Sequence, residues 1–407
     1  MPETLGRRDL AALRVMRAVN AASRGTRRGD GTVAGGRVAM RLAPRILERL
    51  AQRREVALVS GTNGKTTTTA CLAAALATRG EVATNATGAN MLPGHLAALG
   101  ASPHASAAVL ECDEVWLPRM LEVEHPRAVV LLNLSRDQLD RTAEVRHVAD
   151  AWHGALRSLE GVCVANADDP LVVHAALAAS RVAWFAGGLA FRDDAIACPR
   201  CAGHLVFDDA GWRCGCGLAR PVPDAAPTPS GAVLDGTGLA FEMTLPGRFN
   251  HANAVGALLC AARLGVDPDA AAAAIAAVAE VAGRFRTVDV DGVAARLLLA
   301  KNPAGWCALL DLVADDDVPI VVAINARIAD GRDPSWLYDV DFERLAGRRI
   351  VASGERWRDV SARLFYAGVE HECVPEPRDA IVAAGRGRPR TDVIANYTAF
   401  AELHGAT

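Results

Sequence analysis

Short apolar runs alternate with helical stretches along most of this chain. The run Val56–Val59 is followed by glycine-rich polar residues and then by a stretch with helical periodicity, Thr66–Thr78. Runs of this length without a polar residue are typical of strands that are buried on both faces of a parallel sheet. Three later runs, each followed by polar residues and a helical stretch, are Ala107–Leu110, Ala128–Leu132 and Val162–Ala165. The order of strand, turn and helix therefore predicts an α/β domain with a parallel sheet.

The pattern changes in the second half of the chain. Residues 198–217 contain clustered Cys and Gly, and residues 221–237 are rich in Pro, Gly, Ala and Thr, which predicts a loop or linker. The Ala-rich stretch Ala252–Ala282 is predicted to be helical, and we expect the first large domain to end near Gly283–Arg286. Strands of a second α/β domain are predicted by three further apolar runs: Arg296–Ala300, Ile320–Ile324 and Arg349–Ala352.

A strong positive charge sets the first 54 residues apart. They show helical periodicity at 8–20 and 40–53, separated by a Gly- and Arg-rich stretch at 24–37, and they hold thirteen arginines against four acidic residues. Two interpretations fit this charge: a solvated helical face, or attraction to an anionic surface such as a membrane. We therefore predict a basic N-terminal segment, a central domain and a C-terminal domain, at 1–54, 55–285 and 286–407.

The overall composition limits the classes of function. The 407 residues suffice for two or three domains, and 51% hydrophobic and 22% charged residues are typical of globular proteins. A net charge of −3 argues against a molecule that binds nucleic acid over its whole surface. No segment approaches the ~20 consecutive apolar residues of a membrane-spanning helix, and the N-terminus lacks the pattern of a signal peptide. These features predict a cytoplasmic protein whose contact with the inner face of the membrane, if it has one, is peripheral.

The strongest chemical signal is the sequence VSGTNGKTT at Val59–Thr67. Its glycines allow a tight turn whose N–H groups can face phosphate oxygens, and the following helix adds the positive end of its dipole. In such a loop the lysine neutralises the β- and γ-phosphates and the next hydroxyl reaches Mg²⁺. The chain has only two lysines, Lys65 and Lys301, so we expect a compact ammonium to be needed at both positions. Contacts with ATP are predicted for Thr62, Asn63, Gly64, Lys65, Thr66 and Thr67.

The motif GTNGKTT resembles the ATP loop of Mur ligases and folylpolyglutamate synthases. Further blocks resemble the Mur ligases in the same order along the chain: Glu111–Glu114, Asn133–Arg141, Asn166–Pro170, Leu245–Asn253 and Gly283–Phe285. By this resemblance Glu111 holds Mg²⁺ together with the Thr66 hydroxyl, Asn250 contacts the nucleotide, and Arg284 faces ATP. A carboxylate at position 111 suits the metal, because Mg²⁺ is a hard cation that prefers oxygen ligands.

Several positions depart from ordinary Mur ligases and resemble the MurT family instead. Gln138 stands where those enzymes have a metal-binding His, and the central domain has no lysine besides Lys65 that could be carbamylated. The blocks Lys301–Gly305, Ala329–Asp339 and Ser353–Arg356 also resemble this family. The resemblance implies an α/β fold with a Mur-ligase-type central P-loop ATPase domain that carries an inserted zinc ribbon, followed by a Rossmann-like α/β C-terminal domain.

Four cysteines form two pairs in the predicted insertion at about 195–220, where the alternation of strands and helices is interrupted. Twelve residues separate the pair Cys198 and Cys201 from the pair Cys214 and Cys216. Two cysteine pairs on glycine-containing turns favour a structural Zn²⁺ site, and free thiols or a disulfide are the alternatives. Because the second pair has the tighter spacing C-x-C, His204 is a second candidate for the fourth ligand.

The resemblance also implies a reaction and a partner. In the MurT family, ATP converts the α-carboxylate of D-isoglutamate in lipid II, at the membrane surface, into an acyl phosphate that ammonia then attacks. A GatD-like glutaminase supplies the ammonia in a heterodimer, and this chain has no glutaminase signature of its own. We expect Lys301 to stabilise charge on the acyl phosphate or carboxylate, with a surface salt bridge as the alternative. One of Asp330, Asp333 and Asp339 is expected to assist the partner's Cys/His pair, with turn capping as the alternative.

Three other functions compete with this interpretation. An amino-acid-adding Mur ligase or a folylpolyglutamate-synthase-like ligase would need the carbamylated lysine. A non-catalytic ATP-binding scaffold is disfavoured by the intact Lys65, Thr66 and Glu111. A nucleic-acid binder is disfavoured because few basic and aromatic residues lie near the cysteine pairs.

Overall fold

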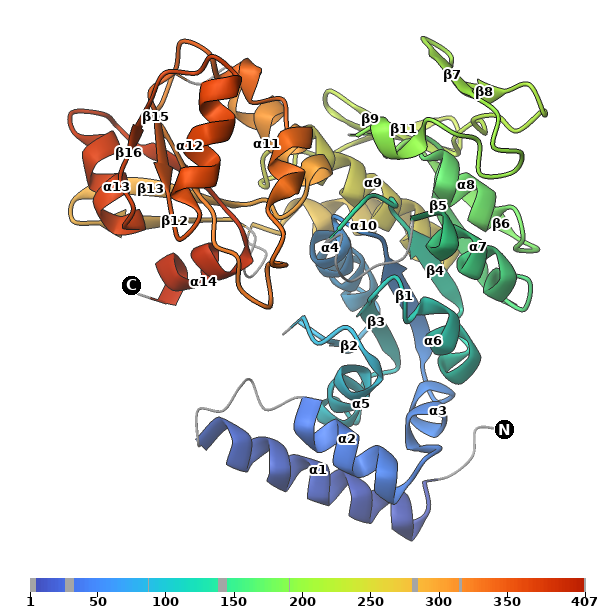
Figure 1. Cartoon of the computed structure of the whole chain (residues 1–407). Coiled ribbons are helices and arrows are strands. Elements are labelled where there is room, and N and C mark those ends of the chain that lie inside the picture. The colour runs from blue at the N-terminus through green and yellow to red at the C-terminus, as the bar shows by residue number, and fades with distance from the viewer. Residues whose placement is uncertain are drawn as a thin grey trace.

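The computed structural model describes residues 5–25, 33–86, 88–137, 145–189, 191–279, 285–314 and 317–405. Figure 1 shows a helical layer at the N-terminal end, a large sheet with helices in the middle, and a second sheet with its own helices at the other end. The N-terminal layer consists of α1 (Arg7–Gly25), α2 (Val33–Leu42) and α3 (Ile46–Ala51).

Buried apolar strands form the large sheet, as the sequence pattern predicts. Its described strands follow the order β11-β10-β9-β6-β5-β4-β1-β3-β2. The strands from β2 to β6 pair in parallel. Their bounds are β1 (Glu55–Ser60), β2 (Val82–Thr84), β3 (Ala107–Cys112), β4 (Ala128–Leu131), β5 (Val162–Asn166) and β6 (Val182–Phe185). The strands predicted near 56, 107, 128 and 162 are confirmed.

Helices cover both faces of the large sheet and close two separate cores. One face packs against α4 (Lys65–Ala77), α9 (Arg248–Arg263) and α10 (Pro268–Ala276). The opposite face packs against α5 (Leu92–Ala101), α6 (Leu117–Glu124), α7 (Val145–Leu156) and α8 (Pro170–Ala176). The N-terminal layer joins the second core through α5, so it forms one packed body with the central sheet.

The place of β1 in the sheet determines where the loops converge. β1 pairs in parallel with β3 on one side and with β4 on the other. The chain thus leaves the carboxyl ends of these three strands at one edge of the sheet. In open α/β sheets, ligands bind in the crevice at the point where the strand order reverses.

One prediction for the region after β6 is wrong. Residues 221–237, which we predicted to be a loop or linker, contain β9 (Ala225–Thr228) and β10 (Gly231–Leu234). Together with β11 (Thr237–Ala240) they extend the large sheet as an antiparallel ribbon. Gly231 and Gly236 have φ of 149° and 81° beside the tight turns. The Gly and Pro content marked the turns correctly, but the strands between them are too short to show an apolar period.

The described part of the Ala-rich stretch from 252 onward is mainly helical, as predicted, and it is divided into two helices, α9 and α10. Gly265, with φ of 80°, follows the end of α9. The side chain of Asp267 then caps α10 by accepting a hydrogen bond from the amide of Ala270. A left-handed glycine followed by a capping aspartate interrupts the helix, although alanine dominates the composition.

The second sheet follows the order β12-β13-β17-β14-β15-β16 among the described strands. β12 is antiparallel to β13, and the other pairs are parallel. The strands predicted near 296, 320 and 349 are confirmed as β13, β14 and β15. The bounds are β12 (Phe285–Val290), β13 (Val293–Leu299), β14 (Ile320–Ala323), β15 (Ile350–Ser353), β16 (His371–Cys373) and β17 (Thr391–Ala395). Its helices are α11 (Pro303–Val313), α12 (Trp357–Tyr366), α13 (Pro377–Gly385), α14 (Tyr397–Gly405) and the 3₁₀ turns η2 (Ser335–Asp339) and η3 (Phe342–Leu345).

The N-terminal layer also differs from the prediction. We predicted residues 24–37 to separate two helices, but α2 begins at Val33 within that stretch. Gly36 lies inside α2, where a Cβ atom would come within 2.2 Å of the Pro93 carbonyl oxygen of α5. The glycine there allows two helices to approach closely. None of the described helices has the length and apolar character needed to span a bilayer.

Candidate active site

The phosphate loop lies between β1 and α4, at the crevice edge of the large sheet. Gly64 has φ of 86° and immediately precedes α4, and a Cβ atom at this position would lie 2.6 Å from the Asn253 side chain. Only glycine therefore fits this turn. The side chain of Asn133, after β4, accepts from the Asn63 amide at 2.9 Å and donates to the Asn63 carbonyl at 3.0 Å. The loop is thus held with the N-terminus of α4 facing the crevice, which favours an anion there.

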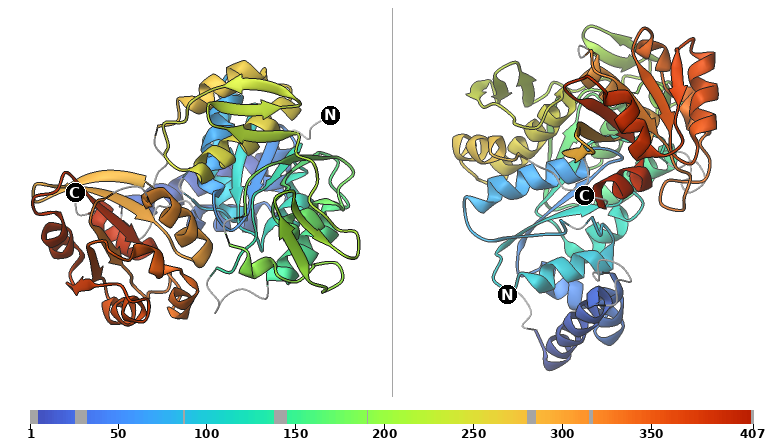
Figure 2. Two further views of the ribbon diagram at one scale, coloured as in Figure 1. Left: turned by 90° about the horizontal axis from the view of Figure 1, so that it is seen from above. Right: turned by 90° about the vertical axis from the view of Figure 1, so that its left-hand side faces the viewer.

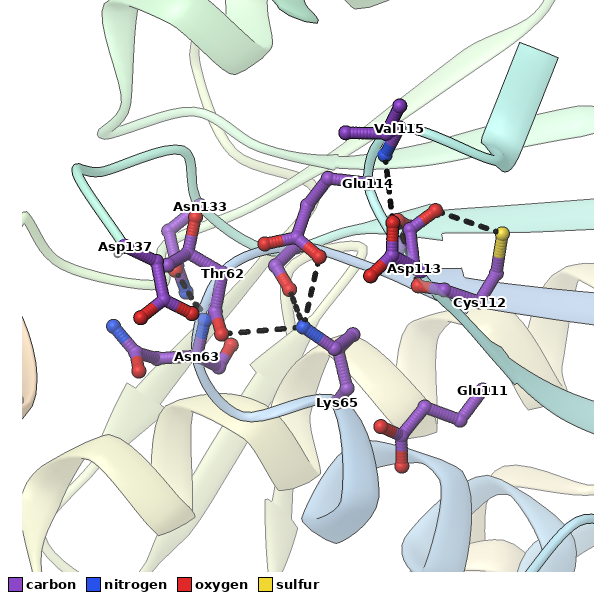
Figure 3. A network of polar contacts seen from close by, with 12 residues as sticks. Thr62, Asn63, Lys65, Glu111, Cys112, Asp113, Glu114, Val115, Asn133 and Asp137 are labelled. Atoms are coloured by element: carbon purple, nitrogen blue, oxygen red, sulfur yellow. Dashed lines mark hydrogen bonds and ion pairs between the residues drawn. The ribbon is translucent and has the colours of Figure 1, made fainter. Parts of the chain in front are cut away.

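Lys65 is buried at the base of this loop. Its ammonium donates to the Gly61 carbonyl at 2.5 Å, to the Thr62 carbonyl at 3.2 Å and to the Glu114 carboxylate at 3.1 Å. Burial acts to lower the pKa of Lys65, but the carboxylates of Glu114 and Glu111 outweigh it, and the pKa is raised. The ammonium is therefore charged and fixed in position before any phosphate binds. Figure 3 shows it pointing at Glu114.

Glu114 is a site residue that the sequence analysis did not single out. Burial opposes its ionisation, yet Lys65 and then Lys301 lower its pKa. The acidic run after β3 was visible in the sequence, but only the fold shows which of its carboxylates reaches the lysine. A buried pair of this kind keeps the Lys65 ammonium charged. When a nucleotide binds, phosphate oxygens can replace the Glu114 carboxylate as the partner of the ammonium.

Glu111 and Thr66 come together as predicted for a metal site. The Thr66 hydroxyl donates to the Glu111 carboxylate at 2.8 Å, and both side chains lie at the N-terminal end of α4. One carboxylate and one hydroxyl offer only oxygen donors, which suits Mg²⁺ and leaves room for phosphate oxygens and water. The residues present therefore fit a magnesium nucleotide.

A buried histidine supports the backbone of Glu111 from below. His95 of α5 contacts the Glu111 carbonyl through Nε2 at 2.8 Å and the Glu124 carboxylate through Nδ1 at 2.8 Å. The two ring nitrogens thus face a carbonyl and a carboxylate, and an imidazolium can donate a hydrogen bond to each of them. Burial acts to lower the pKa of His95, but Glu124 outweighs it and the pKa is raised. Asn85 also holds the Glu111 backbone, by one hydrogen bond to its amide and one to its carbonyl, both at 2.8 Å.

The second lysine approaches from the other sheet and faces the same acidic cluster, which consists of Glu111, Glu114 and Asp137. Lys301, at the end of β13, forms an ion pair with Asp137 in the loop after β4. Both lysines of the chain therefore lie beside the same group of carboxylates, since both also act on Glu114. Next to this pair, the amides of Asn63 and Asn302 exchange two hydrogen bonds at 3.2 Å, and Asn302 also caps α11. These contacts join the two sheets directly across the phosphate loop.

A pocket opens beside the loop between the two sheets. Its polar wall contains Asn63, Thr66 and Asn250, and its apolar wall comes from Leu298 and Leu309 of the second sheet and its helix α11. Asn250, at the start of α9, lines the pocket, where it donates to the Pro246 carbonyl at 2.7 Å. Polar groups at the phosphate end and aliphatic groups at the other end suit a nucleotide. The predicted residue Arg284 and the family position Gln138 lie outside the described residues.

The four cysteines converge in a hairpin that precedes β9. β7 (Leu205–Asp208) and β8 (Gly211–Cys214) pair antiparallel, and the four sulfur atoms all lie within 4.8 Å of one another. The cross-pair distances are 3.7 Å from Cys198 to Cys216 and 3.5 Å from Cys201 to Cys214. His204 instead lies 3.4 Å from the Ile196 carbonyl. A disulfide needs sulfurs about 2.05 Å apart, so these thiols are not oxidised in the structure.

The hairpin is anchored to the central domain on one side. The buried Trp212 donates from its indole nitrogen to the Ala167 carbonyl at 3.1 Å, and Arg220 pairs with Asp168 at 2.5 Å. Both partners lie in the block Asn166–Pro170. The adjacent Asp169 caps α8 and also accepts from the Leu134 amide at 2.8 Å. This block therefore connects the cysteine hairpin to the loop after β4.

The three C-terminal aspartates have different surroundings. Asp330 is 5% exposed and accepts from the Thr398 amide at 2.8 Å and from the Thr398 hydroxyl at 2.5 Å. Asp339 lies 3.3 Å from Arg136 of the central domain. Asp333 is exposed and accepts from the Ser335 amide at 2.9 Å through one carboxylate oxygen.

Comparison with known proteins agrees with the geometry. The model of the Mur ligase middle domain matches residues 59–194, and that of the MurT ligase C-terminal domain matches residues 299–400. The chain is 31% identical to the "lipid II isoglutaminyl synthase (glutamine-hydrolyzing) subunit MurT" of Streptococcus pneumoniae, over 86% of each chain. The Staphylococcus aureus (strain COL) protein of the same name is 30% identical over 92% of each chain. The chain belongs to the MurT family.

Solved structures share the fold of this MurT family member at lower identity. A pseudomurein peptide ligase type C from Methanothermus fervidus has a TM-score of 0.67 at 19% identity, covering 88% of this chain and 80% of its own. A Mycobacterium tuberculosis folylpolyglutamate synthase complexed with ADP has a TM-score of 0.60 at 17% identity, covering 97% and 98%. The arrangement of a central sheet and a C-terminal sheet around the phosphate loop is thus the Mur ligase fold.

The His95–Glu124 pair leads to a prediction about pH. Because the pKa of His95 is raised in the folded state, its contribution to stability is complete below the ordinary value of about 6.5 and is lost as pH rises through the raised value. His95→Gln should lower the free energy of unfolding by roughly 3 kcal/mol at pH 6, because it leaves a buried carboxylate unpaired, and by less at pH 9. Urea denaturation of both proteins at the two pH values measures the difference.

The exposed His104 provides the matched control, and His104→Gln should leave stability unchanged at both pH values. An equal loss of stability for His95→Gln at pH 6 and pH 9 would show that the imidazole is not charged in the folded protein.

Proposed function

We propose that this chain is the ATP-using subunit of a glutamine-hydrolysing lipid II isoglutaminyl synthase. It would convert the α-carboxylate of D-isoglutamate in lipid II into an amide, through an acyl phosphate, during peptidoglycan synthesis. The observation that carries the proposal is that both lysines of the chain face one group of carboxylates, next to the phosphate-loop residues that line the pocket. The relatives that match over most of the chain carry that activity in their names.

Each step of this reaction can be assigned to residues of the chain. A carboxylate oxygen of the substrate attacks the γ-phosphorus of ATP, the bond from that phosphorus to the bridging oxygen breaks, and ADP leaves. Lys65 and the N–H groups at the start of α4 neutralise charge on the phosphates, and positioning with electrostatic stabilisation provides most of the catalysis. Glu111 and Thr66 would hold Mg²⁺, which would supply further positive charge to neutralise the phosphates.

The second step joins nitrogen to the activated carbon. The nitrogen of ammonia attacks the acyl carbon, the carbon–oxygen bond to phosphate breaks, phosphate leaves, and a proton passes to solvent. We assign to Lys301 the role of holding the substrate carboxylate and then the acyl phosphate, after exchange from Asp137. The lysine enters from the second sheet, so the two domains must be together for the site to be complete.

The proposed division of labour follows the three parts of the chain. Residues 55–285 would bind ATP, residues 286–407 would complete the pocket and receive the partner, and residues 1–54 would face the membrane that carries lipid II. The ammonia would come from a GatD-like glutaminase, with this chain working in the cytoplasm as one half of a heterodimer. Nothing in the site favours an amino-acid-adding ligase, because the central domain has no lysine besides Lys65 to be carbamylated.

The direct test measures amidation by mass. Lipid II in detergent, incubated with the purified chain, ATP, Mg²⁺ and an ammonium salt, should lose about one mass unit as the acid becomes the amide. Lys65→Ala should reduce the rate by at least ~100-fold, since it removes a charge that stabilises the transferring phosphoryl group. Arg79→Ala, an exposed change on the same domain, is the control.

Amide formation that persists unchanged in Lys65→Ala would refute the assignment. If amino acids replace the ammonium salt in a parallel incubation, a gain in mass equal to an added residue would instead support the amino-acid-adding ligase.

Among the three aspartates we propose that Asp333 assists the glutaminase. Both oxygens of Asp330 are engaged by Thr398 and Asp339 faces Arg136, whereas Asp333 is exposed with one oxygen at the Ser335 amide. An aspartate can orient the histidine of a Cys/His pair, which the partner would provide.

The nitrogen source separates this role from a structural one. In the complex with the glutaminase, Asp333→Asn should reduce glutamine-dependent amidation at least ~10-fold because the partner's histidine loses its orienting carboxylate. Amidation with an ammonium salt should stay unchanged. The exposed Asp341 gives the matched control, Asp341→Asn. Equal losses with both nitrogen sources, or none, would exclude Asp333 from this role.

We also propose that the four cysteines hold a structural Zn²⁺ ion. Thiolates at about 2.3 Å from a tetrahedral zinc lie about 3.8 Å apart, close to the cross-pair distances of 3.5 and 3.7 Å. All four ligands would be cysteines, so the site has no open position for catalysis, and the C-x-C pair rather than His204 would complete it.

Metal analysis tests the zinc proposal. The purified chain should contain one zinc per molecule, and Cys216→Ser should reduce this to near zero because a three-thiolate site binds more weakly. Removal of zinc by a chelator should also change the fluorescence of Trp212, which packs beside the cluster. The exposed Cys373 lies outside the cluster, so Cys373→Ser should retain the zinc. A protein prepared under reducing conditions without zinc, yet with an unchanged hairpin, would contradict the proposal.

A further inference from the structure

The charge of this protein is divided sharply between its parts. Residues 1–54 contain thirteen basic and four acidic residues, a net of +9, whereas the remaining chain contains 31 basic and 43 acidic residues, a net of −12. The near-neutral total therefore conceals a strong separation of charge. Figures 1 and 2 place the positive part at one end of the molecule, in the layer of α1, α2 and α3, away from the C-terminal domain.

Both acidic residues in the described part of this layer are already paired. Within the described part of the layer, Asp9 is 1% exposed and pairs with Arg49 at 2.9 Å, and Glu48 pairs with Arg45 at 2.9 Å. Among the described residues of the layer, no further acidic side chain opposes the outward arginines. This leaves a surface whose potential is positive and can attract a dense array of negative charge.

The outer face of the α1–α2 hairpin carries both arginines and apolar side chains. The exposed arginines of these two helices are Arg7, Arg8, Arg14, Arg17, Arg37 and Arg41. The same two helices also expose Leu10, Val15 and Leu42, with exposed fractions of 46%, 38% and 41%. The inner stripe of α1, which includes Ala12, Leu13 and Met16, packs into the core. Outward arginines with interspersed apolar side chains are typical of helices that lie on an anionic bilayer.

The layer is rigidly connected to the active site. Gly36 of α2 lies against the Pro93 carbonyl of α5, so tightly that no Cβ atom would fit. Just before α5, the Asn90 carbonyl accepts from the Asp113 amide at 3.0 Å, next to Glu111. Within α5 itself, His95 holds the Glu111 carbonyl. Any surface that binds the layer is therefore held in a fixed relation to the acidic cluster.

We propose that the outer face of the α1–α2 hairpin is a docking surface for an anionic lipid bilayer. Its arginines contact lipid phosphates and its three apolar side chains enter the headgroup boundary. The inference rests on the proposed function in one respect: a substrate carried by a bilayer must be presented to the acidic cluster from the membrane side. The docked layer would set the height of the site above the bilayer.

Vesicle flotation of the full chain without ATP tests this surface. The chain should float with vesicles that contain phosphatidylglycerol and should remain unbound with pure phosphatidylcholine, and high salt should release it because exposed charges are screened. A triple variant combines Arg14→Gln, Arg37→Gln and Arg41→Gln. Its partition coefficient for anionic vesicles should be roughly 100-fold lower, since each arginine near an anionic surface contributes about fivefold.

A matched variant controls for net charge. The control variant combines Arg157→Gln, Arg386→Gln and Arg388→Gln. It loses the same charge from exposed positions on the other two domains and should bind anionic vesicles like the original chain. Equal losses in the two triple variants would overturn the proposal. So would equal binding to both kinds of vesicle, or binding to RNA without binding to vesicles. Circular dichroism melting confirms that each variant is folded.

A second assay separates this inference from the proposed reaction. With lipid II embedded in anionic vesicles, the Arg14, Arg37 and Arg41 variant should amidate at least ~10-fold more slowly than the original chain, because membrane binding concentrates the enzyme on its substrate. With lipid II in detergent the two rates should be equal. Loss of amidation in every chain, with vesicle binding intact, would refute the reaction and leave the docking surface standing.

Discussion

The buried ammonium of Lys65 is the constraint around which the active site is arranged. A charged group at this depth is costly unless it is paired, and here two backbone carbonyls and the Glu114 carboxylate surround it. The carboxylates come from the end of β3, and the carbonyls come from the loop after β1. Both lie at the same sheet edge because β1 pairs with β3 in parallel. The topology thus brings the positive and negative groups together before a nucleotide arrives.

A second ion pair extends this arrangement into the C-terminal domain. Lys301 reaches Asp137 from β13, and the exchanged amide bonds of Asn63 and Asn302 lie beside it. The pocket has polar groups from one sheet and aliphatic groups from the other, so neither domain alone completes it. The shape of the pocket therefore depends on the position of the C-terminal domain, which also carries Asp333 and Asp339. Asp339 pairs with Arg136, the residue next to Asp137, and so connects the C-terminal domain to the loop after β4 a second time.

The structure differs from the sequence patterns, or adds detail to them, for common physical causes. The strands β9 and β10 are too short and too rich in Ala, Gly and Pro to have a strand-like pattern, and they exist because a neighbouring strand completes their hydrogen bonds. The break between α9 and α10 depends on the backbone conformation of one glycine, Gly265. A glycine usually signals a turn, but Gly36 lies inside α2 and permits close contact with α5. In each case local composition was read correctly, while a tertiary contact selected the conformation.

The sequence by itself determined the features whose physics is local. Apolar runs identified the buried strands, the glycine-rich turn identified the phosphate loop, and the spacing of the cysteines identified a cluster of four thiols. The scarcity of lysine marked Lys65 and Lys301 before their positions were known. Only the tertiary structure decided the pairings, such as Lys65 with Glu114 or His95 with Glu111, because these residues are far apart in the chain. Such pairs form where the sheet order brings strand ends together, and no short stretch of sequence encodes that order.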